Sequence, residues 1–384
     1  MRARRRLPLH VMQLTHSLQH GGSEILARDL ALRLEPARVR ASVCAVDLGG
    51  PLEHDLAEAS IPVHVAGRRP GVDWPLVFRL YALFRRHRVD VVQTHHLTQL
   101  IYGGLAARLA GAALIHVEHE YFTLASTTAQ RRLRLLARLS QKVVTVGSAV
   151  RDFLVHRAGL PSTKVEVIPN GVDTGRYAPA PRMSRARLGL PLDGRLIGHV
   201  ARVDPAKDQV TLLRAFRAVA RARPDAHLVI VGDGRGRAAL ETYARELGIA
   251  ARVAFLGARG DVADLLPHFE VFALSSVKEG LPLVVLEAMS CARPVVATAV
   301  GDVPGVVRHA VTGLTVAPGE PARLAEAIVS LLDRPEWSAD LGRQGRALVT
   351  AEFDLATTVR RYEVLYETVT GATVTGARPV EVTA

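Results

Sequence analysis

Residues 275–298, SSVKEGLPLVVLEAMSCARPVVAT, contain the end of one strand, a helix and a second strand. Ser275 and Ser276 end the apolar run VFALSS, Pro282 suits the first turn of a helix, and PVVAT is rich in β-branched residues. The order strand, helix, strand is typical of parallel α/β domains. Two carboxylates, Glu279 and Glu287, interrupt the apolar residues, and carboxylates are seldom buried without a partner. The stretch therefore predicts both a fold and a site.

The same alternation of apolar runs and amphipathic segments continues along most of the chain. It predicts an α/β protein with two doubly wound, Rossmann-like parallel-sheet domains that face each other across a cleft. The expected strands of the first half are LHVMQL, ASVCAV, PVHVA, VDVVQTH, ALIHVEH, KVVTVG and VEVIP. Those of the second half are LIGHVAR, HLVIVG, RVAFLG, VFALSS, PVVATAV and GLTVAP.

The turn cluster VIPNGVD sets the expected domain boundary. We expect an N-terminal domain over 1–173, a Pro-rich linker over 174–192 and a second domain over 193–354. Apolar residues at helical spacing predict a last helix over 355–370 that packs back on the N-terminal domain. Residues 371–384 lack a periodic apolar face and are expected to form a flexible tail. Open parallel sheets bind ligands beyond the carboxyl ends of their strands, so the site is expected in the interdomain cleft.

Charge is unevenly distributed over the 384 residues, which carry a formal net charge of +12. The excess lies in the first half, and Arg131–Lys142 alternates leucines with basic residues at helical spacing. Two interpretations stay open for this segment: a helix on an anionic membrane surface, or a solvated helix with one packed face. No nucleic-acid-binding motif accompanies the charge, so nucleic acid is not an expected partner.

Cysteine content and hydropathy indicate the compartment. Cys44 and Cys291 are the two cysteines, too few for a disulfide framework, which indicates reducing surroundings. The chain has no run of 18 apolar residues and no signal-peptide cleavage site near its start. We expect a bacterial cytoplasmic protein, with peripheral attachment to the inner face of the cytoplasmic membrane as the extension of the membrane hypothesis.

Two loops that follow strands are suited to phosphate. Gly21 and Gly22, in GGSE, precede a helix expected to begin one or two residues later. Glycines there let a ligand approach the backbone at a helix N-terminus, although a tight turn with a serine N-cap is the alternative. In ARVDPAKD, Arg202 and Lys207 are placed to clamp a phosphate, or are solvated loop cations.

Two further motifs resemble cofactor sites but fail the test of spacing. VGDGRGR places Gly232, Gly234 and Gly236 as G-x-G-x-G, and no acidic residue follows at the distance that a dinucleotide site requires. We interpret it as a turn beside a nucleotide. In VEHE, His116 and His119 would point to opposite faces of a strand, and no cysteine completes a zinc pattern. His119, at the strand end, is therefore the functional candidate, and no metal site is expected.

The two carboxylates of the opening stretch have a spacing that fits a nucleotide sugar. Glu279 would lie in the loop before the helix, and a rise of ~1.5 Å per residue would put Glu287 about 7–8 Å beyond Pro282. That is roughly the span from a diphosphate to its ribose, with helix N–H groups between them. The alternatives are a capping glutamate with a salt-bridged one, and a glycosidase acid–base pair about 5–10 Å apart.

Taken together, the motifs resemble the retaining glycosyltransferases of family four (glycosyl transferases group 1), which have the GT-B fold. The most specific match is EGLPLVVLEAM, the Glu-x7-Glu motif, supported by GGSE, VEHE, VIPNGVD, ARVDPAKD, VGDGRGR and VAFLG over residues 8–370. The sequence has no Asp-x-Asp element, by which many sugar-nucleotide enzymes hold a metal, so metal-independent chemistry is expected. The resemblance implies transfer of a hexose, with retention and no cofactor, from a UDP-sugar or GDP-sugar. The implied acceptor is a glycan, a lipid-linked or a small molecule, in cell-envelope or exopolysaccharide synthesis. A GT-B sugar-nucleotide epimerase and a non-catalytic sugar-nucleotide-binding protein are the alternatives.

The resemblance also implies roles for single residues. Glu279 and His119 would contact the transferred sugar, Arg202 and Lys207 would neutralise the departing diphosphate, and Glu287 would bind the ribose hydroxyls. A front-side displacement without a protein nucleophile is implied. Further donor contacts would come from Gly21, Gly22, Gly232, Val253, Phe255, Gly257, Gly280 and Leu281.

The chain departs from the family pattern at two places. Ala292 stands where the family often has glycine, and Leu281-Pro282-Leu283 replaces a commoner sequence with an aromatic residue and glycine. The second departure is expected to alter how the donor sugar is held.

Overall fold

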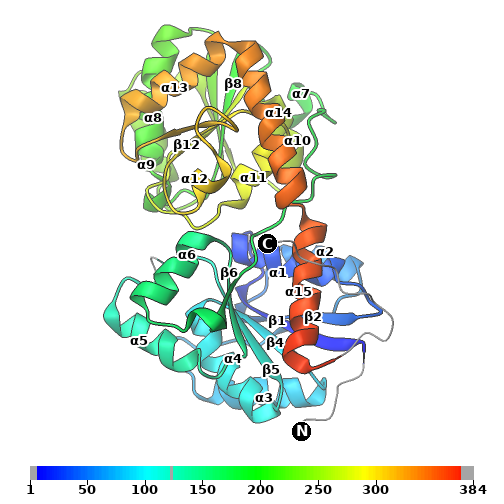
Figure 1. Cartoon of the computed structure of the whole chain (residues 1–384). Helices are drawn as coiled ribbons and strands as arrows, with labels where there is room; N and C mark the ends of the chain where they lie inside the picture. Colours follow the sequence, from blue (N-terminus) through cyan, green and yellow to red (C-terminus); the bar gives the residue numbers. More distant parts are fainter. Residues whose placement is uncertain (1–6, 122–123, 373–384) are drawn as a thin grey trace. The chain divides into compact units, whose positions relative to one another are not determined.

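The computed structural model describes residues 7–121 and 124–372, which fold as two compact α/β units (Figure 1). Unit 1 is Met1–Ile168 with Thr358–Ala384, and unit 2 is Pro169–Thr357. The division falls slightly before the expected boundary because Asn170 and Val172 bond within unit 2. The Asn170 amide nitrogen donates to the carbonyl of Leu281 at 3.3 Å, and the Val172 N–H donates to that of Phe353 at 2.9 Å.

Unit 1 is built on a seven-stranded parallel sheet of order β3-β2-β1-β4-β5-β6-β7, formed by the seven predicted runs. Its strands are β1 Leu9–Ser17, β2 Val39–Leu48, β3 Val63–Val65, β4 Val91–His95, β5 Ala113–Glu118, β6 Lys142–Thr145 and β7 Val165–Val167. Its helices are α1 Gly22–Arg33, α2 Leu52–Glu58, α3 Pro75–Arg86, α4 His96–Ala110, α5 Thr127–Leu136, α6 Ser148–Asp152, a π-helix at Phe153–Arg157, a 3₁₀ turn at Ser162–Lys164 and α15 Leu355–Thr370, which begins in unit 2.

Alternate residues of the unit 1 strands point to opposite faces of the sheet. Met12 and Leu14 of β1 join one apolar cluster with buried residues of α3, α4 and α5. Gln13, between them, points the other way and hydrogen-bonds the hydroxyl of Tyr366 on α15 at 3.1 Å. The helices α3, α4 and α5 therefore cover one face of the sheet, and α15 covers the other.

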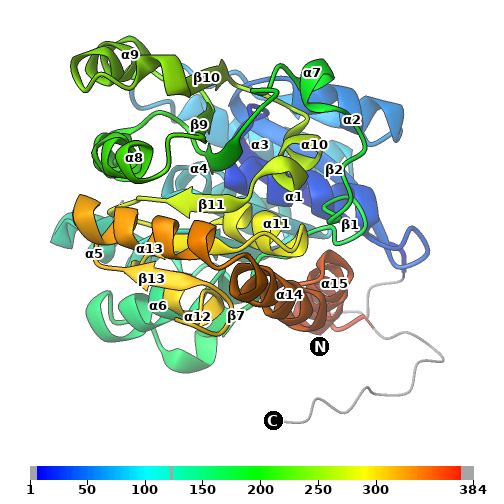
Figure 2. The same cartoon turned by 90° about the horizontal axis from the view of Figure 1, so that it is seen from above.

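Unit 2 has a six-stranded parallel sheet of order β10-β9-β8-β11-β12-β13, formed by the six remaining predicted runs; Figure 2 shows β10, β9, β11 and β13 in this order. Its strands are β8 Arg195–Val200, β9 Ala226–Val231, β10 Val253–Gly257, β11 Val271–Leu274, β12 Val295–Thr298 and β13 Leu314–Val316. Its helices are α7 Arg185–Leu188, α8 Gln209–Ala222, α9 Arg237–Glu246, α10 Val262–Leu265, α11 Leu283–Ser290, α12 Val303–Val306, α13 Pro321–Asp333 and α14 Pro335–Glu352, with 3₁₀ turns at Pro205–Lys207, Ala250–Arg252 and Leu266–His268.

Some segments differ from expectation. The basic helix expected over Arg131–Lys142 ends at Leu136, and Lys142 is already the first residue of β6. The expected tail lies outside the described residues except for Gly371 and Ala372. Among the described helices, none has both the length and the apolarity that crossing a membrane requires.

Candidate functional site

Each sheet reverses its strand order once, and part of the candidate site lies in the loops beside the reversal. In unit 1 the chain turns back between β1 and β4, and in unit 2 between β8 and β11. Loops at the carboxyl ends of two such strands lead to opposite faces of the sheet and leave room for a ligand. Gly21 and His96 follow β1 and β4, whereas Lys207 and Glu279 follow β8 and β11.

An ion pair joins the two loops at the reversal in unit 2. The Lys207 Nζ lies 2.7 Å from Oε1 and 2.9 Å from Oε2 of Glu279, whose side chain is 7% exposed. The Ser276 hydroxyl donates to the same Oε1 at 2.6 Å. The buried carboxylate thus has the partners that burial requires. The sequence singled out both charged residues but not their contact, and it missed Ser276.

Hydrogen bonds to backbone carbonyls hold the Lys207 and Glu279 loops together. The Val277 N–H donates to the Ala206 carbonyl at 2.8 Å, and the Ser275 hydroxyl donates to the Lys207 carbonyl at 2.8 Å. Gly301, at φ +55°, supports the Glu279 loop from behind, since a Cβ there would lie 2.2 Å from the Glu279 carbonyl oxygen. The ion pair therefore rests on fixed backbone rather than on two mobile loops.

Arg202 lies in the same loop as Lys207 but points into solvent. Its side chain is 74% exposed and its ion pair with Asp204 is 3.7 Å long. Gly232, a predicted donor contact, packs against the backbone of this loop: at φ +131°, a Cβ on it would collide with the carbonyl oxygen of Ala201. Close backbone packing requires a glycine at position 232, and this packing holds the backbone of Ala201 and Arg202 in place.

Glu287 lies on α11, 9% exposed, and Pro282 is the N-cap of this helix rather than a residue of its first turn. The backbone of Gly280 and Leu281 precedes the cap. Ala292, after the helix, has φ +53°, a left-handed conformation that costs a residue with a Cβ about 1–2 kcal/mol. The glycine that the family pattern favours at this position would relieve this strain.

The expected nucleobase segment is the edge strand β10. The Phe255 carbonyl accepts a hydrogen bond from Arg237 at 3.1 Å, and the Gly257 carbonyl accepts one from the Gly232 N–H at 2.7 Å. Each of these two carbonyls therefore already accepts one hydrogen bond from within the protein. Val253 pairs with Leu228 of β9 in the sheet.

Gly21 and Gly22 begin α1, with Gly21 as the N-cap. The serine cap considered from the sequence is absent from this helix start, because the Ser23 hydroxyl donates to Glu24 at 2.7 Å instead. A Cβ on Gly22 would meet open space, whereas one on Gly21 would meet the Glu24 carboxylate. An anion that binds this helix start would therefore also face the charge of Glu24.

His119 lies between two other histidines. Its Nε2 is 2.9 Å from Nδ1 of His95, and the two rings stack with centroids 5.2 Å apart; the His96 ring centroid is 4.9 Å away. Burial, together with the neighbouring imidazoles, holds the pKa of His119 well below its ordinary 6.5. The same causes lower the pKa of His95 to about 3. Both rings are therefore neutral at neutral pH.

A buried chain of hydrogen bonds continues from His95 across the sheet. The His95 Nε2 lies 3.0 Å from Oε1 of Gln13, the Gln13 amide donates to the Tyr366 hydroxyl at 3.1 Å, and that hydroxyl donates to Gln93 at 2.7 Å. A donor is needed at each step, so the His95 Nε2 carries its proton and its Nδ1 accepts from His119. The chain thereby fixes the tautomer of His119. Sequence reasoning missed Gln13, Gln93 and Tyr366.

A buried ion pair adjoins the histidines. Glu118 is 1% exposed, and its oxygens lie 3.7 Å from His96 and 3.4 Å from His116. Burial opposes its ionisation, but the two imidazoles outweigh this and bring the pKa of Glu118 to about 2. Burial also opposes the protonation of His96, yet Glu118 raises its pKa above 6.5. His96 has φ +68° and its Nε2 lies 3.0 Å from the Ser23 hydroxyl, so it joins the α1 loop to the histidines.

The structure thus forms two groups of candidate residues. Lys207 and Glu279 meet in unit 2, and His119 joins the glycine loop through His96 in unit 1. His199, which was not predicted, ties β8 to β11 through a 2.9 Å bond from its Nδ1 to the Ala273 carbonyl, and burial lowers its pKa to about 4. Within residues 7–121 and 124–372, no group of three or more His, Cys, Asp or Glu side chains is arranged to hold a metal ion.

Comparison with known proteins identifies the family. Residues 182–348 match the model of glycosyl transferases group 1, and residues 20–176 match that of Glycosyltransferase Family 4. The D-inositol 3-phosphate glycosyltransferase of Mycobacterium leprae is 31% identical over 325 residues, covering 79% of this chain and 72% of that protein. A galactosyltransferase of Escherichia coli, UDP-Gal:alpha-D-GlcNAc-diphosphoundecaprenol alpha-1,3-galactosyltransferase, is 27% identical and covers 68% of this chain and 71% of that one.

A solved structure agrees with this relationship. Anabaena HepE in complex with UDP-glucose is 27% identical with a TM-score of 0.84, covering 94% of this chain and all of HepE. The two parallel sheets, their order of strands and these likenesses point to one conclusion. The chain belongs to the glycosyl transferases group 1 and is a glycosyltransferase with the GT-B fold.

Proposed function

We propose that this glycosyltransferase transfers a hexose from a UDP-sugar, with retention of configuration and without a metal, to a glycan or lipid-linked acceptor of the cell envelope. The observation that carries the donor part is the Lys207–Glu279 pair at the strand reversal of unit 2, with Arg202 in the same loop. UDP as the nucleotide is supported by HepE, which binds UDP-glucose, and by the galactosyltransferase of Escherichia coli.

The atoms of the pair suit a nucleotide diphosphate and a sugar at once. Lys207 has three N–H donors and directs its ammonium group at both oxygens of Glu279, so one donor stays available for a phosphate oxygen. Glu279 accepts two bonds on Oε1 and one on Oε2, which leaves Oε2 able to accept a hydrogen bond from a sugar hydroxyl. Arg202, exposed and charged, adds a second cation for the departing UDP.

We further propose that the other residues singled out from the sequence contact the donor. Glu287 on α11 would bind the ribose hydroxyls, and the amides of Gly280 and Leu281 would bind the diphosphate or the sugar. The loop of Gly21 and Gly22 would approach the donor phosphate, with backbone groups of β10 near the base. His119, neutral and with Nε2 donating to His95, would present Nδ1 as a hydrogen-bond acceptor to a hydroxyl of the transferred sugar.

Retention fits a front-side displacement. In this step the glycosidic oxygen of UDP leaves with its electron pair while the acceptor oxygen attacks from the same side and loses its proton to the departing phosphate. The cations Arg202 and Lys207 stabilise the charge that develops on UDP. The lowered pKa of His119 keeps its imidazole neutral at neutral pH, which supports a hydrogen-bonding role for this residue rather than a charged one. The polyprenyl-linked substrate in the name of the galactosyltransferase supports a lipid-linked acceptor for this chain.

A donor panel tests the proposal. Purified protein is mixed with UDP-, GDP- and ADP-sugars, and binding is followed by thermal shift, since a ligand at 100 times its Kd adds about 2.7 kcal/mol. A membrane and glycan extract then supplies acceptors, while released UDP and the anomeric configuration of the product are measured. We expect stabilisation by UDP-sugars, acceptor-dependent UDP release and retention. Stabilisation by GDP-sugars alone, or an inverted product, would contradict the proposal.

The same assay separates the alternatives. An epimerase would change the sugar of the donor without an acceptor, and a non-catalytic protein would bind the donor but never release UDP. Arg202→Met tests the site itself because the exposed side chain contributes little to the fold. If this variant kept wild-type turnover, Arg202 would have no role on the diphosphate.

A further inference from the structure

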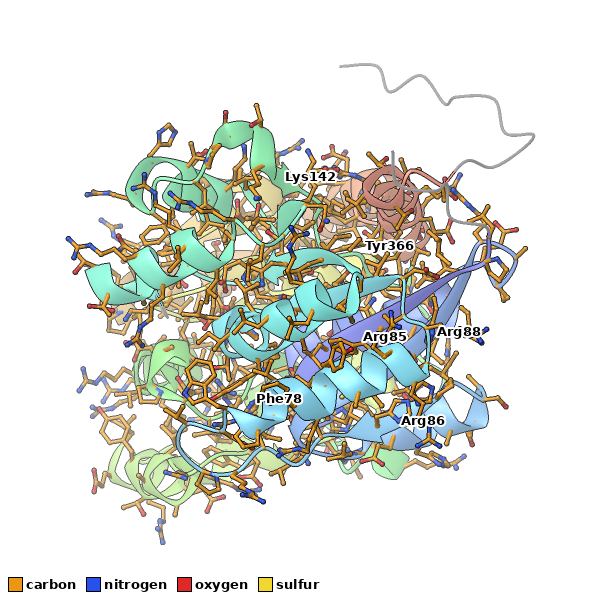
Figure 3. All side chains as sticks on the ribbon, turned by 90° about the horizontal axis from the view of Figure 1, so that it is seen from below. Phe78, Arg85, Arg86, Arg88, Lys142 and Tyr366 are labelled. Atoms are coloured by element: carbon orange, nitrogen blue, oxygen red, sulfur yellow. The ribbon has the colours of Figure 1, made fainter. Side chains whose placement is uncertain are left out.

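The two faces of the unit 1 sheet carry opposite charge patterns. The sequences of α3, α4 and α5, which share one apolar cluster against the sheet, contain seven arginines and no aspartate or glutamate. The sequences of α1, α2 and α15, whose residues lie outside that cluster, contain seven carboxylates and four arginines, which gives them a net negative charge. Figure 3 looks onto the face with α3 and α4. Such a separation within one unit favours an anionic partner for this face.

The helix α3 is apolar on its outer side as well as its inner side. Trp74, Phe78 and Tyr81 follow one another at four- and three-residue spacing, which places them on one side of the helix, and they are 55%, 68% and 36% exposed. Phe78 stands out from α3 in Figure 3. An outward stripe on a surface helix is normally polar. The inner side packs through Leu76, Val77, Leu80 and Phe84.

Basic residues continue this aromatic stripe. Arg85, Arg86 and Arg88 are exposed at the carboxyl end of α3, where Figure 3 labels them. In the part of the chain that the structure describes, the ion pairs involve other arginines, and these three have no carboxylate within 4.0 Å. On α5, exposed Arg131 and Arg132 add further positive charge. Exposed aromatics beside unpaired arginines make this surface unlike the other described helices.

We propose that the α3–α5 face docks unit 1 on an anionic lipid bilayer. This surface is defined by the aromatic residues Trp74, Phe78 and Tyr81 and by the arginines Arg85, Arg86, Arg88, Arg131 and Arg132. Aromatic side chains favour the interface between headgroups and acyl chains, and arginines pair with lipid phosphates. Neither contribution alone anchors a protein firmly, whereas the two together do. The surface is wider than the Arg131–Lys142 segment that the sequence indicated, and most of its residues lie on or beside α3.

Other occupants fit this face less well. In a symmetric dimer each surface meets a copy of itself, so the same unpaired arginines would oppose one another. A free polyanion would satisfy the arginines but would offer no acyl region for Phe78. A bilayer supplies both the charge and the apolar layer. The proposal concerns a surface of unit 1 and does not depend on which sugar is transferred.

Flotation of the full chain with vesicles tests the proposal. Vesicles of phosphatidylcholine alone are compared with a phosphatidylcholine–phosphatidylglycerol mixture, at about 0.1 M and about 1 M salt, where charges are screened beyond about 10 Å and 3 Å. We expect binding to the mixed vesicles that is lost at high salt. Each basic residue near such a surface contributes about fivefold, so the loss of three in R85E/R86E/R88E, with the added repulsion of three glutamates, should lower partitioning by at least about 100-fold. F78S/Y81S should lower it about tenfold or more.

Matched controls lie elsewhere on the chain. R217E/R221E/R360E makes the same charge change at three exposed arginines outside this face, and Val364→Ser removes an exposed apolar side chain of α15. These variants should float like the wild type, and circular dichroism checks that all variants fold. Equal flotation of α3 variants and controls, equal binding to neutral vesicles, or no flotation at all would overturn the proposal. So would binding to nucleic acid without binding to vesicles. Donor binding of the α3 variants should stay at the wild-type level, which separates this test from that of the reaction.

Discussion

Replacing Lys207 by methionine should damage both unit 2 and the reaction, whereas replacing Arg202 by methionine should damage the reaction alone. The Lys207 ammonium contacts both oxygens of Glu279, whose side chain is 7% exposed. The Arg202 side chain is 74% exposed, and its contact with Asp204 is 3.7 Å long. The two cations lie in the same loop and differ in burial, so they separate a structural cost from a catalytic one.

The expected magnitudes follow from these contacts. Removing one partner of a buried ion pair costs about 3–5 kcal/mol, because the other charge stays buried. Ser276 still donates to Glu279 in the variant, so the lower end of that range applies. At about 2–4 °C for each kcal/mol in a unit of this size, Lys207→Met should lower the melting temperature of unit 2 by about 6–12 °C. The exposed pair of Arg202 contributes about 0–1 kcal/mol, so its loss should shift melting little.

Calorimetry and donor turnover check this prediction together. Both variants should lose about 10²–10³-fold in kcat, the range for removal of one group that stabilises developing negative charge. A third variant, Lys207→Met with Glu279→Leu, should melt above Lys207→Met alone because no unpaired charge stays buried. The reasoning is refuted if Lys207→Met melts like the wild type, or if Arg202→Met melts as low as Lys207→Met.

Three further variants test the histidine cluster and a strained turn. Glu118→Gln should lower the pKa of His96, since the strongest partner that opposes the effect of burial is then lost. In the wild type the Glu118–His96 pair stabilises unit 1 between about pH 4.5 and 6.5, and it loses that effect as pH rises through the raised pKa of His96 or falls towards 2; NMR titration and melting against pH would show both. Tyr366→Phe removes the buried partner of the Gln13 amide nitrogen and of Gln93 Oε1, so unfolding should become easier by about 1–3 kcal/mol. The pH profile of turnover should also shift if the hydrogen-bond chain sets the tautomer of His119. Ala292→Gly should raise stability by about 0.5–1 kcal/mol in the same melting assay, unless the left-handed turn carries no strain.

The strands could be predicted because each is a short β-branched run bounded by turn residues. All thirteen runs became strands of two parallel sheets, so local pattern decided the fold class. The contact between Lys207 and Glu279 could not be predicted in the same way. The two residues are 72 positions apart, and they meet only because β11 pairs with β8 rather than with β10. Strand order is decided by long-range packing, which a single sequence does not display.

The side of a helix that packs is equally hidden when both sides are apolar. In α3 the pattern of Leu80 and Phe84 matches that of Trp74 and Phe78, and only the structure shows that the first pair is buried and the second exposed. The hydrogen-bond chain from His119 to Tyr366 could not be predicted from the sequence for another reason. Glutamine and tyrosine within apolar strands and helices give no local signal of a partner on a distant element.

The two strand reversals share a feature that stability alone does not explain. At or next to each one a buried carboxylate lies against a basic side chain: Glu279 against Lys207, and Glu118, which ends the adjoining strand β5, against His96 after β4. The cost of desolvating two charges usually offsets their attraction, so apolar residues of similar volume would stabilise these places as well or better. Yet both pairs lie at the carboxyl ends of the strands, where parallel sheets bind their ligands. Charges that are already oriented and partly dehydrated need little reorganisation when phosphate or sugar arrives, and this advantage exists only at a site that binds and reacts. The positions of the pairs thus support a functional origin for both.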